Sequence, residues 1–165
     1  MARQLRQDPP GGWHHITNRG ARRYDTFIDD EDRASFLDYV IKACDRFGAR
    51  LVSYCLMANH YHLVMHCPDG QVSSIVQTYA ANYTRTFNRD HGFDGRLHSA
   101  RFHNTLLTSL EHAVVATRYG HRNPIEVRYD AISFPWSSLG IFAGERPTGG
   151  SAPNTPAAST VSATQ

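Results

Sequence analysis

The sequence of 165 residues contains little cysteine and no long apolar run. No apolar stretch approaches the roughly 20 residues that a membrane-spanning helix needs, so we expect no membrane association. The residues that follow Met1 lack an apolar core and therefore do not predict a signal peptide. Cys44, Cys55 and Cys67 show no C-x-x-C spacing, which is typical of reduced thiols in a cytoplasmic protein. We therefore expect neither a disulfide framework nor a zinc knuckle.

Lysine is also scarce, because Lys42 is the only lysine among 17 basic residues. A codon bias toward arginine explains this most simply. Arginine also presents a planar fork that fits phosphate and stacks on bases. The net charge of +2 does not by itself indicate a nucleic-acid partner.

The most informative stretch is residues 56–66, with the sequence LMANHYHLVMH. It predicts a strand, in which His60 and His62 point to one face while Tyr61 and Leu63 point to the other. Two imidazoles side by side are a large part of a metal site. Two solvated histidines on an exposed strand would give the same pattern, so both interpretations stay open on these residues alone.

Hydrophobic periodicity predicts the order β-α-β-β-α-β followed by one more helix. The expected strands cover residues 13–17, 50–57, 60–67 and 104–108, and the expected helices cover residues 30–47, 72–89 and 110–123. This order predicts an α+β fold of ferredoxin-like type, with an antiparallel sheet, helices on one face and an appended C-terminal helix. The strand with the two histidines should lie centrally in the sheet.

The chain divides into three expected regions. Residues 1–11 read as a flexible lead, residues 12–143 as one domain, and residues 144–165 as a disordered tail. The tail is rich in Pro, Gly, Ser, Thr and Ala, and such a composition cannot offset the entropy of ordering.

The appended helix carries a second pair of polar residues. Tyr119 and Asn123 are four residues apart and so lie on one helix face, and the helix is expected to stop at Pro124. If this helix packs near the histidine strand, a phenol and an amide would face two imidazoles. A core tyrosine and a helix-ending asparagine would fit the same residues.

Several separate motifs resemble the HUH single-tyrosine transposases, above all the REP-associated tyrosine transposases and their insertion-sequence relatives. The resemblance runs in order from about residue 12 to about residue 140. It rests on residues 13–20 (WHHITNRG), 54–64 (YCLMANHYHLV), 83–88, 95–102, 118–124 (RYGHRNP) and 135–138 (PWSS). The chain departs from the family pattern at Ala58, where proline is common, and at residues 120–122 (GHR), where relatives are apolar.

The resemblance implies specific roles. His60 and His62 would bind a divalent metal, Mg²⁺ or Mn²⁺, with Asn123 in the place of the third ligand. Tyr119 would be the nucleophile that cleaves single-stranded DNA and forms a 5′-phosphotyrosine link. The implied substrate is single-stranded DNA with a hairpin, and the implied setting is the bacterial cytoplasm, with the protein associated with the nucleoid as a monomer or a homodimer.

Arginines supply the candidate contacts to the DNA backbone. These candidates are Arg19, Arg22, Arg23, Arg85, Arg89, Arg96 and Arg101. Three further histidines, His15, His66 and His103, could line the site or be structural. Two other functions stay open: a domesticated, non-catalytic module that binds DNA or RNA hairpins, and a metal-dependent phosphodiester hydrolase in which Tyr119 is only structural.

Overall fold

The computed structural model describes residues 7–146, so residues 1–6 of the predicted lead and 147–165 of the predicted tail lie outside the described residues. The elements are β1 (Gly12–Arg19), the short 3₁₀ helix η1 (Ala21–Arg23), α1 (Asp30–Arg46), β2 (Arg50–Met57), β3 (His60–Cys67), α2 (Val72–His91), β4 (His103–Leu107), α3 (Leu110–Glu126) and α4 (Leu139–Phe142).

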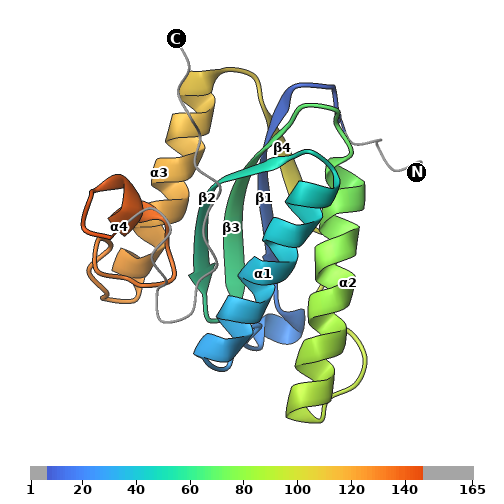
Figure 1. Cartoon of the computed structure of the whole chain (residues 1–165). Helices are drawn as coiled ribbons and strands as arrows, with labels where there is room; N and C mark the ends of the chain where they lie inside the picture. Colours follow the sequence, from blue (N-terminus) through green and yellow to red (C-terminus); the bar gives the residue numbers. More distant parts are fainter. Residues whose placement is uncertain (1–6, 147–165) are drawn as a thin grey trace.

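The strands form one antiparallel sheet in the order β2-β3-β1-β4. Helices α1 and α2 cover one face of this sheet, and α3 lies against the other (Figure 1). The predicted ferredoxin-like arrangement is confirmed, with β3 between two neighbours. Strand β4 begins and ends one residue earlier than predicted.

The alternation along β3 separates two apolar clusters. Tyr61 and Leu63 are fully buried in the main core under α1 and α2, where the ring of Phe36 lies 4.8 Å from that of Tyr61. Val64 faces the other way and packs with Ala116 of α3 in a smaller cluster. The residues on the α3 face of β3 therefore include both His60 and His62.

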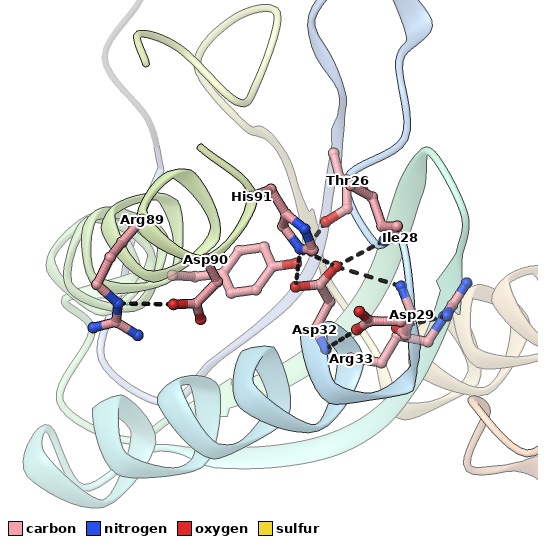
Figure 2. A network of polar contacts seen from close by, with 9 residues as sticks. Thr26, Ile28, Asp29, Asp32, Arg33, Arg89, Asp90 and His91 are labelled. Carbon is pink, nitrogen blue, oxygen red and sulfur yellow. Dashed lines mark hydrogen bonds and ion pairs between the residues drawn. The ribbon is translucent and has the colours of Figure 1, made fainter. Parts of the chain in front are cut away.

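The start of α1 is tied to the end of α2 by one carboxylate (Figure 2). Asp29 caps α1 and accepts from the backbone N–H of Asp32 at 2.8 Å. The Asp32 carboxylate accepts in return from the N–H groups of Ile28 at 2.8 Å and Asp29 at 3.4 Å, which completes a capping box. His91 of α2 reaches the same carboxylate at 2.9 Å. Asp32 is buried, so its carboxylate oxygens accept from groups of the protein and not from solvent.

The sequence predicts that helix α3 stops at Pro124, but the helix continues to Glu126. Proline has no N–H to donate to the carbonyl four residues back, which belongs to Gly120. The side-chain nitrogen of Asn123 donates to that carbonyl at 3.1 Å instead. The missing backbone hydrogen bond is replaced, so the helix can pass through the proline.

Segments outside the sheet anchor both ends of the domain. Asp8 accepts from the backbone N–H of Val72 at 2.8 Å and so caps α2 from a distant part of the chain. Ser137 forms an antiparallel bridge with Cys55 and so covers part of the edge of β2. Within residues 7–146, no helix combines the length and the apolar character that crossing a bilayer requires.

Replacement of Asp32 by alanine should lower the free energy of unfolding by about 2 kcal/mol, because it removes a helix cap and leaves the N–H groups of Ile28 and Asp29 and the side chain of His91 without their shared acceptor. Urea denaturation would measure the change. Asp38→Ala in the same helix is the matched control, because Asp38 pairs with Lys42 on the exposed surface. Equal losses in the two variants would contradict a structural role for the buried carboxylate.

Candidate active site

Strand β3 presents two imidazoles on the face that α3 covers. The ring centroids of His60 and His62 lie 5.4 Å apart, and the rings are nearly perpendicular. On the neighbouring strand β1, Arg19 pairs with His60 and Thr17 with His62. The period of two along a strand thus places both histidines as the sequence predicts.

Helix α3 approaches these histidines very closely at Gly120. A Cβ atom at position 120 would lie 3.2 Å from the Cβ of His62, which is tighter than an ordinary contact. Glycine therefore lets the helix backbone lie almost directly on β3. This contact brings the preceding residue, Tyr119, to the imidazoles, with its ring 5.5 Å from that of His62. The Tyr119 side chain remains 59% exposed, so it is open to a ligand from solvent.

Asn123 points its amide oxygen at the histidines. Its side-chain nitrogen donates to the carbonyl oxygens of Tyr119 and Gly120, both at 3.1 Å. Because carbonyls only accept, the amide cannot be reversed, and its Oδ1 lies 3.2 Å from Nε2 of His60. The same amide weakly opposes the lowering of the pKa of His62.

Burial keeps the imidazoles neutral. Burial, opposed by the contact with Asn123, lowers the pKa of His60 below its usual range. Burial and the adjacent His15 lower the pKa of His62 to about 3. Neutral imidazole is the form that binds metals, so both side chains are ready ligands at neutral pH.

The hydrogen bonds around His60 fit a cation. Its Nδ1 lies 2.8 Å from Oδ1 of Asn59, whose side-chain nitrogen faces the carbonyl of Arg23, so this Nδ1 carries the proton. The unprotonated Nε2 then faces the amide oxygen of Asn123, and two lone pairs meet without a proton between them. A divalent cation accepts both lone pairs and removes the conflict. Nitrogen and oxygen donors of this kind suit Mn²⁺ better than Mg²⁺, because Mg²⁺ prefers oxygen ligands.

The departures from the family pattern at residues 120–122 have structural explanations. Gly120 provides the close contact with β3. His121 is buried, and its Nε2 lies 2.8 Å from the hydroxyl of Ser138. Arg122 points to solvent, so no charge enters the core.

The arginines predicted to contact DNA separate into two groups. Arg19 lies beside the imidazoles, and Arg101 is exposed two residues before β4 begins. Arg22 and Arg23 are exposed in η1, both with positive φ. The remaining three, Arg85, Arg89 and Arg96, belong to α2 and the loop after it, and Arg89 pairs with Asp90 at 2.7 Å. Helix α2 covers the sheet face opposite α3.

The sequence interpretation missed two exposed arginines on α3. Arg118 and Arg122 lie one residue before and three residues after Tyr119. Their spacing from the tyrosine was the signal that could have identified them. His15, considered as a residue that could line the site, contacts both His62 and Tyr119.

A second group of possible ligands lies on the opposite side of the sheet. Asp29, Asp32 and His91 place one ligand atom each within 4.8 Å of one another. These residues join the start of α1 to the end of α2, and both carboxylates already accept backbone N–H groups. The group has a sufficient structural role as a helix cap.

The fold and the geometry define a ferredoxin-like domain in which an exposed tyrosine stands over paired, neutral histidines and a fixed amide. A family model described as "Transposase IS200 like" matches residues 11–105, more than half of the 165 residues. The chain belongs to this family of IS200-like transposases. The matched region contains His60 and His62 but ends before α3, so the placement of Tyr119 and Asn123 rests on the geometry described above.

Two solved structures have the same fold. A REP-associated tyrosine transposase bound to a REP hairpin is similar with a TM-score of 0.70, at 17% identity and over 94% of each chain. A candidate transposase from Deinococcus radiodurans has a TM-score of 0.50 at 18% identity, over 78% of this chain and 97% of that chain. No curated protein sequence matches the chain significantly.

The buried His121 should make the protein sensitive to acid. Burial lowers its pKa to about 4, against about 6.5 for an unfolded chain. Between these values the unfolded state binds one more proton, so stability decreases as the pH falls from about 6.5 to about 4. His121→Asn should be less stable at pH 7.5 but lose less free energy of unfolding by pH 5, as measured by urea titration at both pH values. Parallel losses in the two proteins would refute this assignment.

Proposed function

We propose that this transposase cleaves and rejoins single-stranded DNA with Tyr119 as its nucleophile. One observation carries the proposal: the contact of Gly120 with His62 places the exposed tyrosine beside two neutral imidazoles and a fixed amide oxygen. Core tyrosines such as Tyr79 and Tyr83 are fully buried on the other face and could not reach DNA.

The chemistry needs an anionic phosphodiester to accept an oxygen nucleophile. The phenol oxygen of Tyr119 attacks phosphorus, the bond from phosphorus to the 3′ oxygen breaks, and the displaced oxygen leaves as a 3′-OH with the proton lost by the phenol. The product is a 5′-phosphotyrosine link, which conserves the bond for rejoining to another 3′-OH. His60, His62 and Asn123 would hold a divalent cation, Mg²⁺ or Mn²⁺, which when bound neutralises phosphate charge and favours the phenolate.

The proposed substrate is single-stranded DNA with a hairpin. The open position of Tyr119 suits a flexible strand, and Arg19 together with the exposed Arg118 and Arg122 supplies positive charge around it. We further propose that residues 12–143 are the functional domain, that it acts on bacterial nucleoid DNA in the cytoplasm, and that it works as a monomer or a homodimer.

Two other functions remain distinguishable. A metal-dependent hydrolase would use bound water and form no covalent adduct. A non-catalytic hairpin-binding module would bind DNA equally well with and without metal. The fixed amide and the neutral histidines favour metal-dependent chemistry over hairpin binding alone, which requires neither.

The test is a covalent-adduct assay with labelled hairpin DNA from the flanks of the gene, Mn²⁺ or Mg²⁺, and a denaturing gel. We expect a metal-dependent band of slower mobility that is lost in Tyr119→Phe, a change that removes only the nucleophilic oxygen. Tyr129→Phe is the matched control, because Tyr129 is equally exposed at 59%. Cleavage without an adduct would indicate the hydrolase, and tight metal-independent binding without cleavage would indicate the hairpin-binding module.

Arginines on the site side should contribute to DNA affinity more than arginines on α2. Arg19→Gln should weaken binding of the hairpin DNA and reduce the slope of log affinity against log salt by about 1, because one phosphate contact is lost. Arg89→Gln is the control, since this side chain is paired with Asp90. Fluorescence anisotropy at several salt concentrations would measure both. A larger effect from Arg89 than from Arg19 would place the DNA on the α2 face.

A further inference from the structure

A third imidazole contacts the candidate metal site from strand β1. His15 pairs with Val64 on one side and Thr105 on the other, so sheet pairing on both sides fixes its backbone. Its Nε2 lies 3.0 Å from Nδ1 of His62, and the two rings are nearly parallel, with centroids 5.3 Å apart and an interplanar angle of 15°. The contact is therefore specific in both distance and orientation.

Only one of the two facing nitrogens carries the proton of this hydrogen bond. If His15 donates from Nε2, the neutral His62 must carry its own proton on its Nε2, which blocks that nitrogen as a ligand. If His62 donates from Nδ1, its Nε2 is left with a free lone pair. Ligating histidines usually donate their other N–H to an acceptor in this way.

The other histidine of the pair shows the same arrangement. His60 directs its Nδ1 at the amide oxygen of Asn59, 2.8 Å away, and this leaves Nε2 toward Asn123. Both imidazoles then have an acceptor behind Nδ1 and a free Nε2. For His62 the acceptor is another histidine, which can accept only when its own proton is on Nδ1.

We propose that His15 is a positioning residue that accepts the Nδ1 proton of His62 and so holds Nε2 of His62 free to bind the metal. The link to catalysis rests on the proposed function, whereas the proton position is a property of the metal-free protein. Ring packing alone would give a different outcome, because any aromatic ring at position 15 would then suffice.

The experiment compares His15→Phe, which keeps a ring but removes the acceptor, with His15→Gln, whose amide oxygen can accept near the same place. His66→Phe is the matched control, because His66 lies on the same face of β3 and its ring contacts Trp13. Long-range ¹H–¹⁵N correlation spectra of the metal-free proteins report which nitrogen of His62 carries the proton. Electron paramagnetic resonance of free Mn²⁺ gives the dissociation constant.

We expect His62 to carry its proton on Nδ1 in the wild type and to shift toward Nε2 in His15→Phe. The Mn²⁺ dissociation constant should rise about 10- to 100-fold in that variant, remain near wild type in His66→Phe, and recover in His15→Gln. A wild-type His62 protonated on Nε2, or a His15→Phe variant with unchanged proton position and Mn²⁺ affinity, would overturn the proposal.

The two proposals fail in different ways. If the wild type shows the expected proton position and the His15-dependent Mn²⁺ affinity but forms no adduct with DNA, the positioning role stands and the proposed function is wrong. If the wild type forms the adduct but His15→Phe keeps its Mn²⁺ affinity, the function stands and the positioning role is wrong. Amide spectra of each variant show whether the domain is folded.

Discussion

The candidate site depends on the close contact between α3 and β3 at a single glycine. With no side chain at position 120, the helix backbone rests on the Cβ of His62. A Cβ atom at this position would displace the helix by a few tenths of an ångström or force the strand to give way. Functional groups must be held within about 0.5 Å of their productive positions, so a shift of this size would use much of the tolerance in the placement of Tyr119 against the imidazoles. The cost of glycine in a helix, about 1 kcal/mol relative to alanine, is offset by the packing that it permits.

Asn123 links the integrity of the helix to the chemistry of the site. Its amide nitrogen takes the place of the N–H that Pro124 lacks, and this same hydrogen bond directs its oxygen at His60. Aspartate at this position would provide oxygen ligands, but it has no N–H to donate to the carbonyls of Tyr119 and Gly120. The sequence Asn-Pro therefore joins a structural role to the proposed ligand role of Asn123 in two adjacent residues.

The sequence predicts the elements better than the contacts between them. A period of two is sufficient to place His60 and His62 on one face, and helical spacing is sufficient to align Tyr119 with Asn123. The close approach of these two pairs depends on how α3 packs across the sheet, which local periodicity does not encode. In the sequence, Gly120 is only a departure from the family pattern. The benefit of its missing Cβ becomes visible once the structure shows that His62 lies against it.

The end of α3 and the contact of His15 with His62 also depend on contacts that local sequence patterns do not encode. Pro124 predicts a helix end by local rules, and only the side-chain hydrogen bond of Asn123 explains why the helix continues. His15 and His62 are 47 positions apart in the chain, and their contact requires the register of β1 against β3. Strand register and helix packing thus bring these residues together and bury them. Their burial, rather than their spacing in the sequence, lowers the pKa values of His60 and His62 and leaves both in the neutral form that metal binding requires.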